Sequence, residues 1–327
     1  MKIVTFTNEE AGAVERASRV GALLDDGEYI LEFALAIRGG GSASDSSKTA
    51  NSLVNPLTWF DLDGAWLKRA REVYDEIAET PQNLERACEG GLVISRSTVR
   101  LLAPVPRPGK LIAIGLNYRD HAAESKLPIP ERPVVFSKFT TSIIGPDEAV
   151  ILPPPSEQVD YEAELAVVIG RRAKNVTRDN ALDYVLGYTN INDVSARDFQ
   201  FADGQWQRGK SCDTFAPMGE AIVTADEIPD PHKLSIKLRL NGNTMQDSNT
   251  DQLIFGVPEL VAFLSETITL EPGDVIATGT PPGVGFARKP PVFLKHGDVM
   301  EVEIENLGTL RSPVIAAHES ASSVARL

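Results

Sequence analysis

The chain has 327 residues, of which 42% are hydrophobic and 24% are charged, as in an ordinary globular protein. Its net charge of −14 disfavours binding to the phosphate backbone of nucleic acids, and no apolar run reaches the roughly 18 residues expected of a membrane-spanning helix. Two cysteines without zinc or redox spacing, and an N-terminus that resembles a strand rather than a secretory signal, predict a cytoplasmic protein without nucleic acid or membrane partners.

Residues 1–104 are expected to form a smaller α/β accessory domain. Strand-like segments at residues 20–24 and 29–33 flank the sequence DDG, which is typical of a hairpin turn. Apolar residues then recur at helical spacing from Trp66 to Ile77, which predicts a surface helix with one buried face. No motif in this region indicates catalysis.

Residues 105–327 are expected to form a β-rich α+β catalytic domain. Alternating prolines at its start disfavour regular structure, so we place the domain boundary after residue 104. Beyond them, one amphipathic helix is indicated at residues 258–264, and the scarcity of long helices disfavours a doubly wound sheet. Strands are predicted at residues 111–114, 134–136, 161–169, 185–191, 234–240, 274–278 and 299–304.

Three carboxylates form a candidate metal site. Glu162 and Glu164 are two residues apart in a predicted strand, so both side chains point to the same face. Adjacent carboxylates that leave bulk water repel each other unless they share a cation, and Asp193, at the end of another strand-like run, offers a third ligand. Oxygen-only ligation suits Mg²⁺ or Mn²⁺, and also Ca²⁺, rather than zinc. The alternative is that the glutamates are solvated charges on an edge strand.

His121 and Glu124 are a candidate acid–base pair. The residues between them favour a helix, and side chains three residues apart on a helical turn share one face. A carboxylate that orients an imidazole and stabilises its protonated form makes the ring a better general base for water. The alternative is an ordinary pair on the surface of a helix.

Two further segments offer groups that bind anionic oxygens. Lys210 can neutralise a substrate carboxylate or a developing oxyanion, unless it is a solvated loop lysine. Residues 278–285 form a Gly/Pro-rich loop whose backbone N–H groups can hold anionic oxygens. Its glycines match neither the P-loop nor the dinucleotide-binding pattern, and the chain has no GxSxG, so these enzyme classes are disfavoured.

Taken in order, these segments resemble the fumarylacetoacetate hydrolase superfamily, including its acylpyruvate hydrolases. The matching stretches are residues 115–124, 136–146, 160–170, 187–200, 209–219 and 273–285. The resemblance implies a mixed β-roll catalytic fold and a homodimer. The residues it implies are Glu162, Glu164 and Asp193 as metal ligands, His121 and Glu124 as the water-activating pair, and Gln200, Lys210 and Thr280 as contacts of the substrate's oxygens.

We therefore expect a metal-dependent hydrolase that cleaves a carbon–carbon bond in a small acidic substrate. The substrate would be a 2,4-dioxo acid, either an acylpyruvate or a 2,4-dioxo-3-deoxy sugar acid, and the products pyruvate and a carboxylic acid. His121, oriented by Glu124, would activate the water, and Lys210 would hold charge on the substrate. Alternatives are an oxaloacetate decarboxylase, a dienedioate isomerase or decarboxylase of the same superfamily, and a non-catalytic ligand-binding member.

Overall fold

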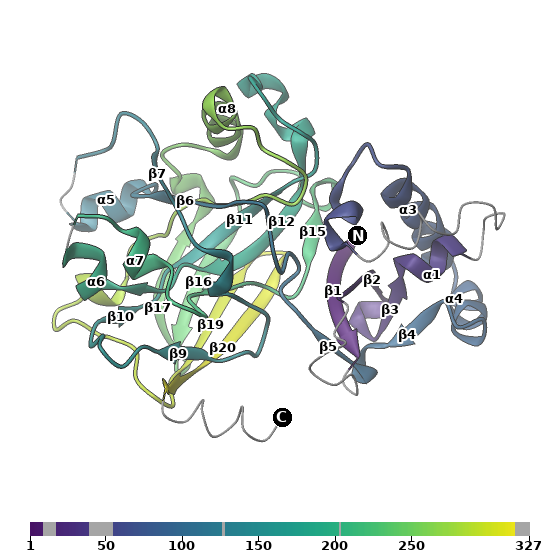
Figure 1. Cartoon of the computed structure of the whole chain (residues 1–327), viewed down its shortest axis with the longest axis horizontal. Coiled ribbons are helices and arrows are strands. Elements are labelled where there is room, and N and C mark those ends of the chain that lie inside the picture. The colour runs from purple at the N-terminus through teal and green to yellow at the C-terminus, as the bar shows by residue number, and fades with distance from the viewer. Residues whose placement is uncertain (9–17, 39–54, 126–127, 203, 318–327) are drawn as a thin grey trace.

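The computed structural model describes residues 1–8, 18–38, 55–125, 128–202 and 204–317. Figure 1 shows a smaller lobe, built from the N-terminal hundred residues, beside a larger lobe built from the remainder. The smaller lobe contains β1 (Lys2–Asn8), β2 (Arg19–Leu24), β3 (Tyr29–Glu32), α1 (Phe33–Arg38), α3 (Ala65–Ala78), α4 (Pro81–Glu89), β4 (Val93–Ser95) and β5 (Val99–Leu101).

Local patterns in the smaller lobe are confirmed. Strands β2 and β3 pair antiparallel across Asp25–Gly27, with Leu24 opposite Tyr29, as the turn sequence predicts. Helix α3 covers the expected segment, and its buried residues recur every three or four positions, so that one face packs inward. These buried residues are Leu67, Ala70, Val73 and Ile77.

The larger lobe is rich in short strands, which confirms the expected α+β fold. Each predicted strand is present, although the one expected at 161–169 begins at Ala163. The helices are α5 (Arg119–Ser125), α6 (Arg197–Ala202), α7 (Gln207–Lys210) and α8 (Val257–Thr267). The strands are β6 (Leu111–Gly115), β7 (Val134–Ser137), β8 (Ile143–Ile144), β9 (Val150–Leu152), β10 (Val159–Asp160), β11 (Ala163–Ile169), β12 (Val185–Asn192), β13 (Ser195–Ala196), β14 (Ala216–Pro217), β15 (Ile222–Thr224), β16 (Ser235–Leu240), β17 (Asn243–Asn249), β18 (Val275–Ala277), β19 (Val299–Ile304) and β20 (Gly308–Ala316).

One large sheet runs through both lobes. Its strand order is β4-β3-β2-β1-β15-β12-β11-β18-β6-β7, and β5 pairs with β1. The lobes join where β1 pairs antiparallel with β15, with Ile3 opposite Ile222. Residues 102–110, which connect β5 to β6, contain no helix or strand. A division of the chain after residue 104 stays a proposal.

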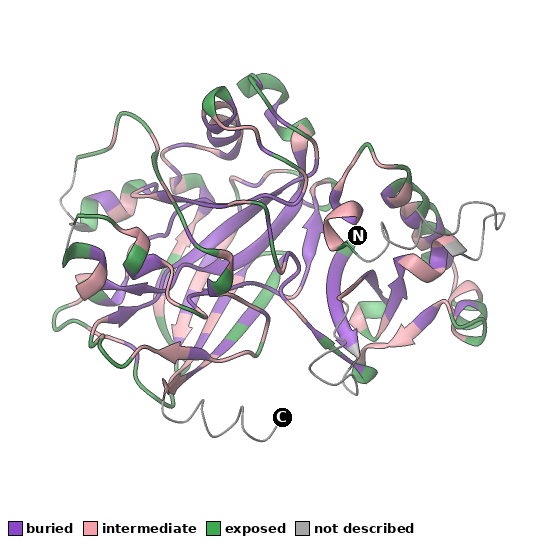
Figure 2. Ribbon diagram, viewed as in Figure 1, coloured by how far each residue is buried: buried purple, intermediate pink, exposed green. Residues whose placement is uncertain are grey.

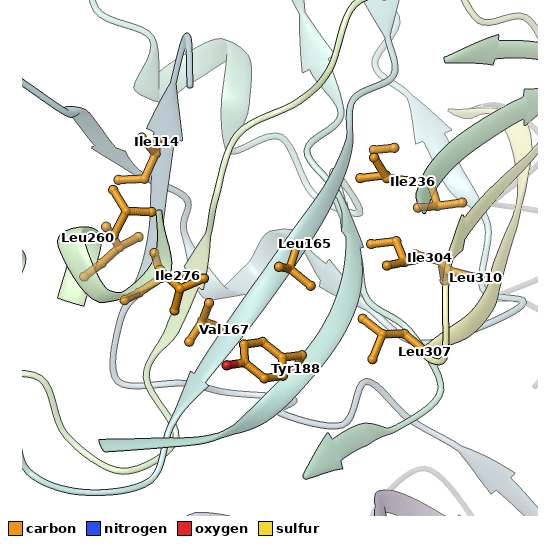
Figure 3. Packing of buried hydrophobic residues seen from close by; sticks show 14 of the residues in the cluster. Ile114, Leu165, Val167, Tyr188, Ile236, Leu260, Ile276, Ile304, Leu307 and Leu310 are labelled. Carbon is orange, nitrogen blue, oxygen red and sulfur yellow. The ribbon is translucent and has the colours of Figure 1, made fainter. Parts of the chain in front are cut away.

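A second sheet, in the order β17-β16-β19-β20-β9, packs against the larger lobe's part of the first sheet. Figure 3 shows Leu165 and Val167 of β11 in a core with Ile236 and Ile304 from the second sheet. The opposite face of β11 is covered as well, since Ala166 and Val168 belong to a separate buried cluster. Both faces of β11 are therefore buried, which explains its nearly continuous apolar sequence and its colour in Figure 2.

Candidate metal centre and active site

The pairing of β11 with β12 brings the three predicted carboxylates together. Ala163 lies opposite Asn192, so the residues that flank this pair, Glu162 and Asp193, are adjacent, and the Asp193 N–H donates to the Glu162 carbonyl at 2.8 Å. One carboxylate oxygen from each of Glu162, Glu164 and Asp193 lies within 4.8 Å of the others. Because β11 is a central strand and all three residues are buried, they are not solvated charges on an edge.

Three buried cations surround these carboxylates. Lys210 Nζ lies 2.7 Å from Glu162 Oε2 and 2.7 Å from Asp193 Oδ2, and only 2% of its side chain is exposed. It is therefore part of the site and not a solvated loop lysine. Lys138 Nζ lies 2.5 Å from Asp193 Oδ1, and Arg197 Nη2 lies 2.6 Å from Glu162 Oε1. Each ion pair supplies part of the charge balance that burial requires.

The ionisation of the two glutamates differs. Burial opposes ionisation of Glu162, but Lys210 and Arg197 outweigh it and hold its pKa at about 2. Burial, with the charges of Asp193 and Glu162, raises the pKa of Glu164 well above its usual value, although Lys210 and the Gly279 N–H partly compensate. Glu164 is thus the carboxylate whose ionised form the surrounding cations balance least.

The donor set fits a divalent cation. At this site, the buried charged groups that contact one another are four carboxylates and three cations, which leaves an excess of one negative charge when all are ionised. Carboxylate oxygens are the ligands preferred by hard cations such as Mg²⁺, Mn²⁺ and Ca²⁺. A cation among the three clustered carboxylates would relieve the repulsion that raises the pKa of Glu164. These carboxylates are Glu162, Glu164 and Asp193, with Asp160 bound to Arg197 behind them.

The predicted acid–base pair lies on α5, at the same end of the larger lobe as α6 and α7 in Figure 1. His121 Nδ1 is 3.3 Å from Glu124 Oε2, which confirms that the two side chains face each other. Both oxygens of Glu124 also accept the N–H of Gly283 at 3.1 Å. The Gly/Pro-rich loop thus supplies a backbone donor, but in this structure the donor holds a protein carboxylate.

A cavity of about 430 Å³ joins the acid–base pair to the carboxylates. Its polar lining consists of His121, Glu124, Glu162, Glu164, Arg197, Gln200, Lys210 and Thr280. Its other wall is apolar and aromatic, and contains Ile114, Leu116, Phe136, Phe201, Trp206, Val284 and Phe286. A larger hollow of about 820 Å³ lies beside β7, but no carboxylate is found among the described residues that line it. The smaller cavity is therefore the candidate active site.

All three predicted substrate contacts line this cavity, and two of them, Gln200 and Thr280, are hydrogen-bonded to neutral or cationic side chains and to the backbone. Gln200 Oε1 accepts from Arg197 Nη1 at 2.9 Å, so its side-chain amide donors remain the groups that can face a substrate. The Thr280 hydroxyl donates to the Ala163 carbonyl at 3.0 Å and accepts from Gln246 Nε2 at 2.8 Å. Its remaining side-chain capacity is one acceptor lone pair.

Residues 110–315 match the model of the family described as fumarylacetoacetate (FAA) hydrolase C-terminal. The chain belongs to this family. It is 52% identical over 225 residues to oxaloacetate tautomerase of Xenopus laevis. The aligned region covers 68% of this chain and 70% of that relative. The predicted superfamily is therefore confirmed.

Solved structures of family members confirm the fold as well. Fumarylacetoacetate hydrolase from Exiguobacterium antarcticum matches with a TM-score of 0.75 and 33% identity, over 97% of this chain and 99% of that chain. 5-Carboxymethyl-2-hydroxymuconate delta-isomerase from Mycobacterium smegmatis matches with a TM-score of 0.70 and 33% identity, over 97% and 100%. A tautomerase, a hydrolase and an isomerase are thus all similar to this chain, so family membership alone does not select the reaction.

Sequence reasoning did not identify Lys138 and Arg197 as parts of the site. Both residues lie within stretches that carry the family resemblance, but neither has a local spacing that relates it to the carboxylates. Lys138 reaches Asp193 across 55 residues of chain, and Arg197 reaches Glu162 from the start of α6. Their positions within these stretches were the available signal, and position alone does not identify a partner.

Proposed function

We propose that this protein is a divalent-metal-dependent enzyme that catalyses keto–enol proton transfer on oxaloacetate or a closely related 2-oxo acid. The observation that carries the proposal is the single cavity lined by the His121–Glu124 pair and by the carboxylates Glu162 and Glu164. The name of the relative from Xenopus laevis supports the reaction, and an isomerase among the structural neighbours supports proton transfer as the shared chemistry.

The proposed reaction assigns separate roles to the clustered carboxylates and to the His121–Glu124 pair. Glu162, Glu164 and Asp193 would hold a divalent cation, which would supply the Lewis acidity that favours the enolate form of a 2-oxo acid. His121 takes the proton from C3 of the keto acid, and Glu124 stabilises the imidazolium that forms. The His121 imidazolium then gives this proton to the oxygen on C2, which yields the enol and restores the neutral imidazole. The reverse reaction moves the proton from this oxygen to His121 and then to C3.

Lys210 and Gln200 orient the substrate. The ammonium group of Lys210 has three donors, of which Glu162 and Asp193 take one each. The third donor is available for an anionic oxygen of the substrate in the cavity. The amide donors of Gln200 serve the same purpose, and Thr280 offers its remaining lone pair to a substrate hydroxyl.

Hydrolysis of a 2,4-dioxo acid is the second candidate, because the apolar wall of the cavity favours it. Phe136, Trp206 and Val284 line this wall, and an apolar acyl group would pack there, whereas oxaloacetate has a second carboxylate at the corresponding end. His121 would then activate water for attack on the distal carbonyl, and the carbon–carbon bond would break with an enolate as leaving group. The proton-transfer group is the same in both reactions.

The deciding experiment compares the two substrate classes on one preparation. We expect loss of the enol absorbance of oxaloacetate to accelerate with Mg²⁺ or Mn²⁺ and to return to the uncatalysed rate in excess chelator. Pyruvate should not form from oxaloacetate faster than in buffer. Rapid pyruvate release from an acylpyruvate, with no change in the rate of keto–enol interconversion of oxaloacetate, would show that the reaction is hydrolysis and not tautomerisation. Pyruvate release from oxaloacetate would indicate decarboxylation.

A pair of histidine variants tests the assignment of the acid–base group. His121→Ala should lower kcat at least about a hundredfold, the usual contribution of general acid–base catalysis, without abolishing Mn²⁺ binding measured by calorimetry. His296→Ala is the matched control, since His296 accepts a backbone N–H on the protein surface. Equal activity of the two variants would contradict the role of His121.

Assembly and location stay predictions. Among the described residues, no helix is both long and apolar enough to cross a membrane. We propose a homodimer and a cytoplasmic location, while the name of the Xenopus laevis relative assigns that protein to mitochondria. Sedimentation of the purified chain would test the dimer.

A further inference from the structure

The loop from Thr280 to Arg288 determines where the carboxylate of Glu124 lies. The Gly283 N–H is 3.1 Å from each Glu124 oxygen, and one of these oxygens is 3.3 Å from His121 Nδ1. The acid–base pair therefore depends on a backbone group that lies 159 residues away in the sequence. Any movement of Gly283 changes the direction from which Glu124 meets the imidazole.

Gly283 has little freedom to move. Its φ of +100° lies in the region that favours glycine, and a Cβ at this position would lie 2.0 Å from the Met245 carbonyl oxygen. The loop thus packs directly against β17, which contains Met245. The orientation of the Gly283 N–H is then set by the groups that hold the loop to this strand.

Arg288 provides this connection. Its Nε donates to the Gly283 carbonyl at 3.2 Å, and its Nη2 donates to the Met245 carbonyl at 2.5 Å. The Tyr161 hydroxyl donates to the same Gly283 carbonyl at 3.3 Å. A planar guanidinium can bridge two carbonyls in a fixed geometry, whereas a lysine ammonium cannot reproduce the fork.

A separate anchor holds the loop on the side of the carboxylate cluster. Asp160 accepts the N–H groups of Gly285 at 2.7 Å and Phe286 at 3.0 Å, and it also binds Arg197 Nε at 2.9 Å. Loss of Arg288 leaves this anchor in place. We therefore expect an Arg288 variant to fold and to retain the metal site.

We propose that Arg288 is a positioning residue that holds Gly283, and through it Glu124, in the place where Glu124 orients His121. The proposal rests on the proposed function, because His121 is the group that it expects to transfer the proton. Arg288 does not contact the substrate in this account. Its effect on the reaction passes through the Gly283 N–H and the Glu124 carboxylate.

The kinetic test is a double-mutant cycle. Arg288→Ala should lower kcat by roughly 10- to 100-fold, the range associated with a small misplacement of a reacting group, while KM changes by less than about threefold. In a Glu124→Ala background, Arg288→Ala should add less than about threefold, because residues that act as a unit are not additive. Arg288→Lys should lower kcat less than Arg288→Ala, because an ammonium group can keep one of the two carbonyl contacts. An equal effect of Arg288→Ala in both backgrounds would overturn the proposal.

A measurement that does not depend on turnover tests the role of Arg288 even if the proposed function is wrong. The ¹⁵N NMR signals of the His121 ring should move in Arg288→Ala towards those of Glu124→Ala, because the contact at Nδ1 is weakened in both. Mn²⁺ affinity by calorimetry should stay within about twofold of wild type, since the Asp160 anchor remains. Unchanged ring signals would refute the role of Arg288 even if no oxo acid is turned over.

The matched control is Arg239→Ala. Arg239 is also half-buried, and it pairs with Glu303 at 2.6 Å between β16 and β19, outside the cavity. Its replacement should leave the His121 signals and kcat unchanged. A change of the same size as in Arg288→Ala would show that loss of any half-buried arginine disturbs the site, and would also overturn the proposal.

Discussion

Replacing Glu164 by glutamine should stabilise the metal-free protein and remove most of its stabilisation by a divalent cation. Glu164 shares a buried cluster with Glu162 and Asp193, with ligand oxygens no more than 4.8 Å apart. At that distance and an effective dielectric constant of about 20, one like-charge pair costs roughly 3.5 kcal/mol. Attraction to Lys210 and the hydrogen bond from the Gly279 N–H offset part of this repulsion. The gain in the free energy of unfolding of Glu164→Gln should therefore be smaller than the full repulsion.

The free energy of unfolding of the metal-free protein should depend on pH through Glu164. The pKa of Glu164 is raised from a usual value of 4.5, so above that pH the folded protein keeps a proton that the unfolded chain releases. The free energy of unfolding of the metal-free wild type should therefore fall as pH rises from 4.5, by up to about 1.4 kcal/mol per pH unit. The fall should stop once the pH exceeds the raised pKa. Glu164→Gln should not show this fall in the free energy of unfolding, because glutamine has no proton to release.

Urea denaturation in excess chelator, repeated with Mn²⁺, measures both effects. The variant should exceed wild type by at least about 1.4 kcal/mol at pH 8, and the difference should shrink towards pH 5. With Mn²⁺ at about 100 times the Kd of wild type, the free energy of unfolding of wild type should rise by about 2.7 kcal/mol. That of Glu164→Gln should rise much less at the same Mn²⁺ concentration. A variant less stable than wild type in chelator at pH 8 would refute the electrostatic reasoning.

Two further substitutions address the surroundings of the cluster. Lys138→Met should lower the free energy of unfolding by up to about 3 kcal/mol, because buried Asp193 loses one of its two cations and keeps Lys210. The exposed-pair control Lys233→Met should cost less than about 1 kcal/mol in the same urea experiment. Gly279→Ala should destabilise the protein more than Gly297→Ala: both have positive φ, but only at Gly279 would a Cβ meet a neighbouring side chain, at 2.7 Å. Because the Gly279 N–H holds Glu164 at 2.8 Å, calorimetry should also show weaker Mn²⁺ binding by Gly279→Ala, and equal behaviour of the two glycine variants would contradict this account.

Features set by local backbone geometry could be predicted from the sequence. The hairpin across Asp25–Gly27 and helix α3 follow from turn residues and from apolar spacing. The His121–Glu124 contact follows from the three-residue spacing on one helical turn. The three candidate metal ligands also come together as expected, although the spacing of Glu162 and Glu164 alone favoured a pair of solvated glutamates.

Features set by contacts between distant segments could not be predicted in this way. Lys210 was expected near a substrate, but the structure shows it bound to Glu162 and Asp193. The backbone N–H groups of residues 278–285 were expected to be able to hold anionic oxygens, and that of Gly283 holds Glu124. In each case the residue type indicated the kind of partner, an anionic oxygen, but did not identify which one.

By itself, the sequence determined the strand-rich fold, the carboxylate cluster and the family, because periodicity and the order of short motifs are properties of the chain. The tertiary structure decided which charges are buried together and how the two lobes connect. Arg197 and Lys138 offset part of the negative charge of the cluster, and the pairing of β1 with β15 extends the sheet. The physical reason is that burial makes an unpaired charge costly, and which charges are buried depends on strand register and packing across the whole chain.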